Sequence, residues 1–355
     1  MLPGKENYRR AIEFAGPKWT PVQLHCPFDG LYEQDETKEA RINELAGRFP
    51  DDLLQVNPAF KFIRPLEKVN GVLHWVDHWG TAWTDDGHGA KTESHPLEAG
   101  YHLLDAYVVP DPHDPDLYTA ADGALEKRGG RYVLASVWFT LFERLWMLRG
   151  FDNMLLDPLT DETAFYGLRD TVLEYALGVT DEWLKRGVNG IFFSDDWGSQ
   201  RGLLINPDDW RRYWRPAYAR LFRRVREGGA HVWMHLCGDI REILPDLIDL
   251  GLNALNPVQP QAMPIYELAR DFGGRVCFNG GADVQGVMVS GSPDDVRAHI
   301  QELVDTFARP DGGYVLTTSH GLMPETPLDN IIALYETALE CCRRNPPDSQ
   351  VQLGN

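Results

Sequence analysis

The sequence predicts an α/β fold, namely a (β/α)8 TIM barrel with a β-hairpin-containing insertion after its second strand. Two observations predict this class. Short apolar runs alternate with amphipathic helical stretches along nearly the whole chain, as in a parallel sheet covered by helices. The length of 355 residues is long for one ordinary domain but common for an α/β barrel.

Eight apolar runs have the length and composition of buried strands, with polar residues, glycine or proline at their ends. The predicted strands span 21–25, 52–56, 131–135, 189–194, 231–235, 253–256, 275–279 and 313–317. Because parallel strands need a long crossover connection, we expect helices between them.

Four of the predicted helices have clear boundaries. They span 160–186, 207–227, 293–308 and 327–343. The first opens with Asp161 and Glu162, which suit the positive end of the helix dipole. The second and third have a proline in the first turn after a capping residue, Asn206 or Ser292. The fourth is apolar at helical spacing.

The connection after the second predicted strand is much longer than the others. In this insertion, at about 57–130, polar and aromatic residues alternate between His74 and Trp83, which predicts a β-hairpin over the barrel mouth. We expect a single barrel domain over 1–345 that contains this insertion. A polar, frayed tail is expected at 346–355.

Composition excludes several classes of partner. A formal net charge of −19 repels phosphate backbones, so nucleic acid is not an expected partner. No apolar run is long enough to span a membrane, and the first residues lack the basic and apolar regions of a signal peptide. Five cysteines in so long a chain form no disulfide framework. We therefore expect a cytoplasmic protein whose reduced thiols can bind metal.

Reactive side chains cluster just after the predicted strands, where TIM barrels build their active sites. These residues are His25, Cys26, Asp195, Asp196, His235, Cys237, Gln259, Asn279 and His320. Because the carboxyl ends of all strands meet at one rim, we expect these groups to converge there.

His235 and Cys237 form the sharpest candidate pair. One residue separates them just past a strand end, and an imidazole and a thiolate are natural zinc ligands. His320 is the expected third ligand, which leaves one position open as catalytic zinc sites require. Cys26 is a weaker candidate for a fourth ligand. The alternative is that the His-x-Cys pair only packs in the core, as Cys277 in mid-strand is expected to do.

Two further groups have both a functional and a structural interpretation. Of Asp195 and Asp196, one could hold a metal-bound or cationic group while the other caps a loop, or both could cap loops. Trp79 and Trp197 could line an apolar substrate pocket. The tryptophans of the insertion are explained equally well as the packed face of a hairpin.

Several motifs resemble the uroporphyrinogen decarboxylase-like superfamily. They are Ser194-Asp-Asp-Trp-Gly-Ser-Gln-Arg-Gly, Met234-His-Leu-Cys-Gly-Asp-Ile, Ala254-Leu-Asn-Pro-Val-Gln-Pro, Phe278-Asn-Gly-Gly-Ala-Asp and Tyr314-Val-Leu-Thr-Thr-Ser-His-Gly-Leu-Met-Pro. The resemblance covers about 190–335 in barrel order and is looser before that. The true decarboxylases of this superfamily are metal-free and carry an Arg-Gln-Ala-Gly-Arg stretch near the N-terminus. This chain has His25-Cys-Pro-Phe-Asp-Gly instead, without an arginine pair.

The chain is more similar to the superfamily's corrinoid-dependent methyltransferases, which hold zinc through a His-x-Cys pair and a later cysteine. His235 and Cys237 match that pair, and His320 falls where the later cysteine would be. Gln259 falls near the sequence position at which related methionine synthases carry a glutamate ligand. The resemblance implies Zn2+, a corrinoid carried by a partner protein, and a homodimer.

These observations predict a zinc-dependent methyltransferase that moves a methyl group between a small substrate and a corrinoid protein. The substrate could be an aryl methyl ether or a thiol; a His, Cys, His ligand set favours the ether, because it makes zinc a stronger Lewis acid. Asn279, Gln259 and one aspartate would orient the substrate or a ligand. Two alternatives stay open. One is a metal-free decarboxylase or lyase acting on a small carboxylic acid, with His320 as proton donor. The other is a non-catalytic protein that binds a corrinoid or substrate.

Overall fold

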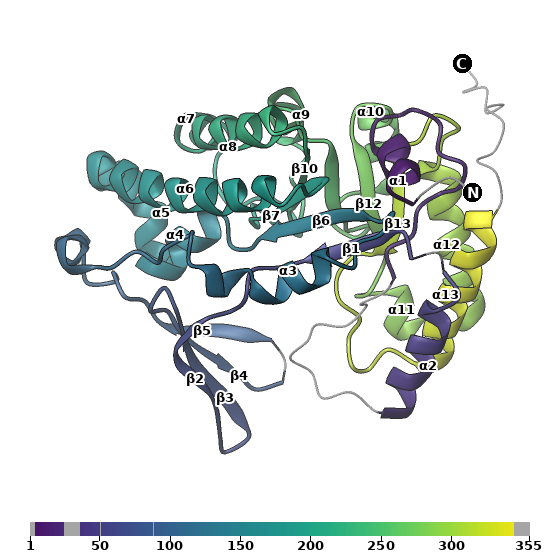
Figure 1. Ribbon diagram of the computed structural model, residues 1–355, viewed down its shortest axis with the longest axis horizontal. Coiled ribbons are helices and arrows are strands. Elements are labelled where there is room, and N and C mark those ends of the chain that lie inside the picture. The colour runs from purple at the N-terminus through teal and green to yellow at the C-terminus, as the bar shows by residue number, and fades with distance from the viewer. Residues whose placement is uncertain (1–3, 25–35, 50, 88, 344–355) are drawn as a thin grey trace.

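A parallel sheet forms the centre of the protein, for which a computed structural model describes residues 4–24, 36–49, 51–87 and 89–343 (Figure 1). Its seven strands lie in the order β1-β6-β7-β10-β11-β12-β13, and every neighbouring pair is parallel. The strands are β1 (Leu53–Val56), β6 (Tyr132–Val137), β7 (Gly190–Ser194), β10 (His231–His235), β11 (Ala254–Val258), β12 (Cys277–Ala282) and β13 (Tyr314–Thr318). The predicted TIM-barrel class is confirmed.

The first predicted strand, 21–25, is reduced to a single bridge. Val22 pairs in parallel with Leu316 of β13, and the amide of Gln23 donates a hydrogen bond to the carbonyl of Leu316. This segment therefore lies beside the last strand, β13, in the position that the remaining strand of an eight-stranded barrel would occupy. His25 and Cys26 lie outside the described residues.

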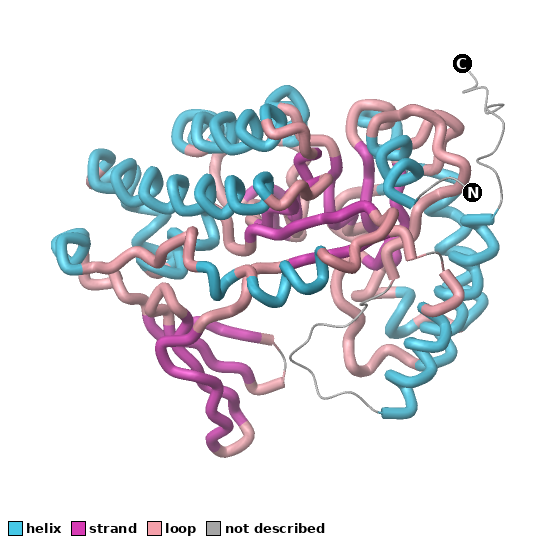
Figure 2. Tube along the Cα trace, viewed as in Figure 1, coloured by secondary structure: helices cyan, strands magenta, loops and turns pink. Residues whose placement is uncertain are grey.

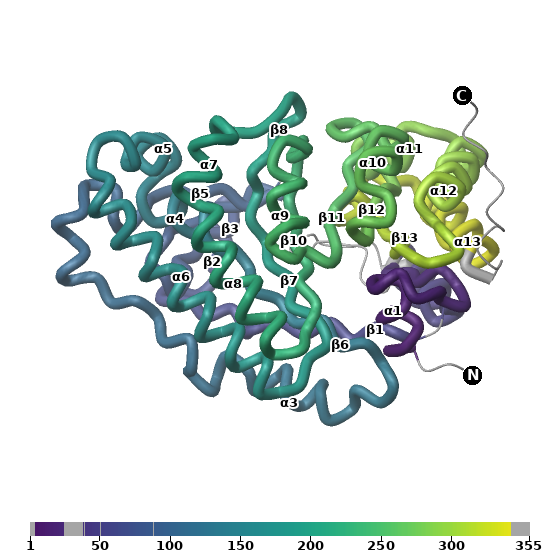
Figure 3. The backbone as a smooth tube through the Cα atoms, turned by 90° about the horizontal axis from the view of Figure 1, so that it is seen from above, coloured from purple at the N-terminus to yellow at the C-terminus, as the bar shows by residue number. Residues whose placement is uncertain are grey.

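Helices surround the sheet, with α6 and α8 outside β6, β7 and β10, and α12 outside β12 and β13 (Figure 3). The helices are α1 (Gly4–Ile12), α2 (Glu36–Ala46), α3 (Thr119–Leu125), α4 (Phe142–Arg149), α5 (Phe151–Thr160), α6 (Glu162–Lys185), α7 (Pro207–Tyr213), α8 (Arg215–Glu227), α9 (Leu244–Leu250), α10 (Ile265–Phe272), α11 (Val287–Ser290), α12 (Pro293–Phe307) and α13 (Leu328–Arg343). Across the described ranges, none of them combines the length and the apolar composition that crossing a bilayer requires.

The two predicted caps, Asn206 and Ser292, form as expected, and Asp161, expected in the first turn, caps α6 instead. The side chains of Asp161, Asn206 and Ser292 each accept a hydrogen bond from a backbone amide in the first turn of α6, α7 and α12. The predicted helix 207–227 is divided at Trp214. Pro216 has no amide proton, so it cannot continue the helical hydrogen bonds of α7, and the chain starts a new helix there.

The insertion forms an antiparallel sheet of four strands rather than one hairpin (Figure 2). Its strands are β2 (Phe62–Val69), β3 (Val72–Asp77), β4 (Ala82–Asp85) and β5 (Ala90–Ser94). Trp75 and Trp83 stack at 6.0 Å and pack with Met147 of α4. The insertion is therefore attached to the helix that follows β6, at the carboxyl-terminal side of the central sheet.

The interior of the barrel is an apolar layer to which every strand of the central sheet contributes. The layer consists of Leu53, Tyr132, Leu134, Phe192, Trp233, Ala254, Cys277 and Val315, together with Tyr8 and Ile12 of α1. Tyr8 stacks on Tyr132, the first residue of β6, at 5.5 Å. Helix α1 therefore fills the amino-terminal end of the barrel.

A polar layer follows this apolar layer toward the carboxyl ends of the strands. Side chains two residues apart share one face of a strand, so the residue two positions after each apolar one also faces inward. From β6 to β13, the last such residue on each strand of the central sheet is polar: Ser136, Ser194, His235, Asn256, Asn279 and Thr317. The alternation of the strands thus places the first candidate ligand, His235, at the barrel mouth.

Candidate metal centre

The structure brings His235, Cys237 and His320 together. Their potential ligand atoms all lie within 4.8 Å of one another, and Cys237 Sγ is 3.3 Å from His235 Nε2. The rings of His235 and His320 are 5.9 Å apart. A nitrogen and a sulfur on one tetrahedral zinc ion would be about 3.6 Å apart, given usual bond lengths. The three residues therefore fit a zinc ion with only small side-chain movements.

A chain of amide side chains orients His235. Its Nδ1 lies 2.6 Å from Asn256 Oδ1, and Asn256 Nδ2 donates to Asn279 Oδ1 at 2.7 Å. Asn279 Nδ2 in turn donates to the carbonyl of Val315. Because Asn256 Oδ1 can only accept, the neutral ring carries its proton on Nδ1, and Nε2, which faces Cys237, is its unprotonated nitrogen. That tautomer is the one that binds metal through Nε2.

Cys237 is held by the loop that follows β10. Its amide donates to Asp196 Oδ1 at 2.8 Å, and the next amide, of Gly238, donates to Gln259 Oε1. Burial raises the pKa of the Cys237 thiol far above its usual value, and the charge of Asp196 raises it further. The thiolate therefore needs a nearby cation, which a metal ion would supply.

The two adjacent aspartates have different environments. Asp195 is fully buried and accepts hydrogen bonds from the amides of Leu141, Phe142 and Glu143, at the start of α4, and from the Tyr218 hydroxyl. It therefore anchors α4 and does not face the barrel mouth. Asp196 is partly exposed, and its Oδ1 lies 3.8 Å from His235 Nε2. Only Asp196 of this pair borders the metal candidates.

Both tryptophans expected in a substrate pocket lie instead in the packed core. Trp197 is buried against Phe142 and Trp214, and its Nε1 donates to Tyr218. Trp79 is buried with its ring 4.7 Å from that of Tyr175. Neither indole is available to a substrate, because side chains of α4, α6 and α8 pack against them.

Asn279 and Gln259 also differ from the expected substrate contacts. Asn279 is fully buried behind Asn256, and Gln259 is buried behind the Cys237 loop. Both residues support the metal candidates through a neighbour. Asn256 was not identified from the sequence, although the two-residue period from Ala254 in the barrel interior places it at the mouth.

Two more residues at the mouth were missed. Trp138, the first residue after β6, is 38% exposed; its ring lies 5.7 Å from that of Phe192, which in turn is 5.9 Å from His235. The strand-end rule identifies Trp138 once β6 is known to end at Val137. Glu143 reaches the mouth from α4, where its Oε2 accepts a hydrogen bond from Ser194 at 2.9 Å. No strand-based rule identifies a residue on a helix.

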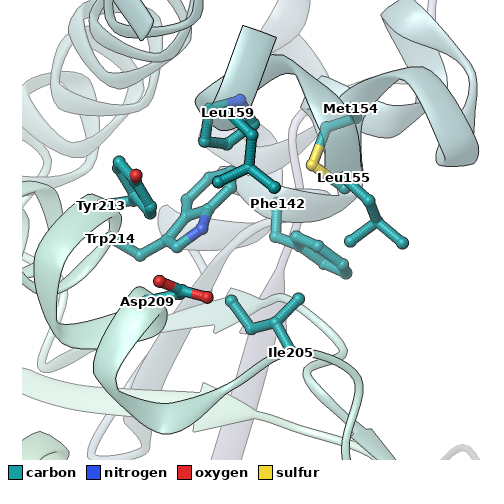
Figure 4. A pocket seen from close by; sticks show the side chains of 9 residues that line it. Phe142, Met154, Leu155, Leu159, Ile205, Asp209, Tyr213 and Trp214 are labelled. Atoms are coloured by element: carbon teal, nitrogen blue, oxygen red, sulfur yellow. The ribbon is translucent and has the colours of Figure 1, made fainter.

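A separate apolar pocket lies on the outside of the barrel between α5 and α7 (Figure 4). Its lining residues are Phe142, Met154, Leu155, Pro158, Leu159, Ile205, Asp209, Tyr213 and Trp214. The three metal candidates are not part of this lining, so the pocket and the candidate centre are distinct.

Residues 86–341 match the uroporphyrinogen decarboxylase family. The chain belongs to this family. The match includes every strand of the central sheet except β1, and it confirms the resemblance seen in the sequence motifs.

Relatives of this uroporphyrinogen decarboxylase family member include both decarboxylases and methyltransferases. It is 23% identical over 183 residues to a uroporphyrinogen decarboxylase of Bacillus cereus, covering 52% of this chain and 49% of that protein. It is 26% identical over 166 residues to a methylcobamide:CoM methyltransferase of Methanosarcina barkeri, covering 46% and 45%. The chain thus spans about half the length of the curated relatives that it matches.

A methyltransferase from Methanosarcina mazei shares the fold of this uroporphyrinogen decarboxylase family member over almost its whole length. The TM-score is 0.69 at 14% identity, with 96% of this chain and 99% of the other covered. This similarity shows the architecture alone.

Proposed function

We propose that this chain is a zinc-dependent methyltransferase that moves a methyl group between a small substrate and a corrinoid protein. The observation that carries the proposal is the approach of His235, Cys237 and His320 to within 4.8 Å. The similarity to a methylcobamide:CoM methyltransferase supports the reaction class.

The residues of this chain prepare the site for a cation. His235 presents Nε2 in the metal-binding tautomer, because Asn256 accepts a hydrogen bond from the protonated Nδ1. Asp196 adds negative charge beside both His235 and Cys237, which favours binding of a cation. Bound zinc would supply Lewis acidity toward the heteroatom that loses or receives the methyl group.

The charges at the mouth favour this reaction over decarboxylation. Asp196 is an acid beside His235, whereas burial favours the protonated, neutral form of Glu143. Arg144, a neighbouring cation, is buried and paired with Asp77 at 3.1 Å. The charge of Asp196 would repel a substrate rich in carboxylates, whereas it would not repel a neutral methyl donor or acceptor.

Metal analysis tests the proposal directly. We expect the purified wild-type protein to hold about one zinc ion per chain, because three ligands and one open position form a catalytic zinc site. His235→Ala and Cys237→Ala each remove one of three ligands, so both variants should lose the metal. Elemental analysis after dialysis measures this.

Matched controls lie within the same barrel. His231 is at the other end of β10, where it contacts Tyr132 and Glu13, and Cys277 is buried in the apolar layer. His231→Ala and Cys277→Ala should therefore keep the zinc. A wild-type protein without zinc after both aerobic and anaerobic purification would refute the proposal and favour a metal-free lyase.

A further inference from the structure

The carboxyl group of Glu143 lies beside the polar layer at the barrel mouth. Glu143 belongs to the first turn of α4, and its Oε2 accepts a hydrogen bond from Ser194 Oγ. Ser194 pairs in register with His235 on the adjacent strand β10. Neighbouring strands lie about 4.8 Å apart. The serine that binds the Glu143 carboxyl group is therefore the direct neighbour of the candidate metal ligand His235.

The surroundings of Glu143 favour its protonated form. The residue is only 8% exposed, and burial raises the pKa of its carboxyl well above the usual value. The charges of Asp196 and Asp195, at the end of β7, raise this pKa further. The hydrogen bond from Ser194 and the charge of Arg144 lower this pKa, but their effects are smaller than those of burial and the two aspartates, and the Arg144 guanidinium is paired with Asp77. A buried carboxylic acid that keeps its proton at neutral pH can act as a general acid.

We infer that Glu143 protonates the oxygen of a methyl ether as its methyl group leaves. This role rests on the methyl transfer proposed above, and it narrows the substrate to an oxygen ether and the direction to demethylation. Methyl transfer to a thiol would have no use for such an acid, because a thiol must lose a proton before it can accept a methyl group.

The step balances in atoms and electrons. The carbon–oxygen bond breaks as the methyl carbon bonds to Co(I) of the corrinoid protein, and the cobalt electron pair forms the new bond, so that cobalt is formally oxidised to Co(III). The electron pair of the broken bond stays on oxygen, which takes the Glu143 proton and leaves as a hydroxyl group. A water molecule then returns a proton to the Glu143 carboxylate.

Glu143→Gln separates proton donation from a structural role. The glutamine amide has nearly the same shape, and its carbonyl oxygen can still accept the hydrogen bond from Ser194. It has no acidic proton to give. Glu162→Gln is the matched control, because Glu162 also occupies the first turn of a helix, α6, but pairs there with the exposed Arg212.

The experiment uses the zinc-containing protein, free cob(I)alamin as methyl acceptor, and two methyl phenyl ethers as probes. With 4-methoxyphenol, whose leaving oxygen is strongly basic, Glu143→Gln should slow transfer by about 10²–10⁴-fold, the usual contribution of a general acid. With 4-nitroanisole, whose phenolate leaves without a proton, it should have little effect. Glu143→Asp should restore part of the lost rate, and Glu162→Gln should match wild type with both ethers.

A second readout does not depend on activity. The infrared difference spectrum between zinc-bound wild type and Glu143→Gln at neutral pH should contain the carbonyl band of a protonated carboxyl group. Equal slowing with both ethers, absence of that band, or methyl transfer by the zinc-bound wild type with thiols but not with ethers would each overturn the inference. If the proposed function itself were wrong, the wild-type protein would hold no zinc. That outcome differs from each of the three that would overturn the role of Glu143.

Discussion

Replacing Asp195 with alanine should lower the free energy of unfolding by about 3–5 kcal/mol, because several buried hydrogen bonds are lost together. Three amides at the start of α4 and the hydroxyl of Tyr218 donate to this carboxylate. Without it, these donors remain buried and unsatisfied, and α4 loses the negative charge that its amino-terminal end favours. The midpoint of urea unfolding, followed by circular dichroism, measures the effect.

Asp161 provides the matched control for this stability prediction. It caps α6 by accepting a hydrogen bond from the amide of Ala164, in an exposed position. Asp161→Ala should cost only about 1 kcal/mol, as is usual for an exposed helix cap. If Asp195→Ala were no more destabilising than Asp161→Ala, the anchoring role of Asp195 would be wrong.

Replacing Asn256 with leucine should weaken zinc binding by about 10–100-fold without removing a ligand, as is usual when the partner of a metal-binding histidine is lost. Leucine has the same branching as asparagine but cannot accept the hydrogen bond from Nδ1 of His235. The imidazole ring would then be free to rotate and to exchange its tautomer, so fewer molecules present Nε2 to the metal. Competition with a chromophoric chelator at fixed pH measures the affinity.

Two further substitutions make the zinc-affinity prediction specific. Asn256→Asp keeps an oxygen acceptor for His235 and should retain most of the affinity. Asn253→Ala changes an asparagine at the other end of the strand, where its side chain accepts a hydrogen bond from the Val232 amide, and should leave zinc affinity unchanged. Equal affinities of Asn256→Leu and wild type would show that Asn256 does not orient the ligand.

The residues that sequence reasoning placed correctly are those whose position depends on the strands. His235 and Cys237 follow a strand end, and the topology of a parallel barrel brings His320 to the same rim from 83 positions further along the chain. The period of two residues and the single rim are properties of the fold class. They can therefore be used before any contact is known.

The residues that sequence reasoning misplaced are those whose environment is determined by other elements. Asp195 and Trp197 follow a strand as closely as Asp196 does, but Tyr218 of α8 and the first turn of α4 enclose them. Nothing in residues 190–200 reveals where those helices pack. Glu143 was missed for the same reason, since it reaches the mouth from a helix.

The insertion shows a similar limit. Alternating residues between His74 and Trp83 predict strands, and two strands form there. The outer strand β2 is exposed along all its residues, so it has no alternation of buried and exposed side chains to detect. The sheet therefore has more strands than the pattern predicts.

The filled amino-terminal end of the barrel, where Tyr8 stacks on Tyr132, has a kinetic consequence for the proposed transfer. With that end blocked by α1, the small substrate and the much larger cobalt-carrying protein must both arrive through the opposite opening. The larger molecule would obstruct the path of the smaller, so binding should be ordered, with the small substrate first. An excess of the corrinoid protein should then slow turnover when the small substrate is scarce.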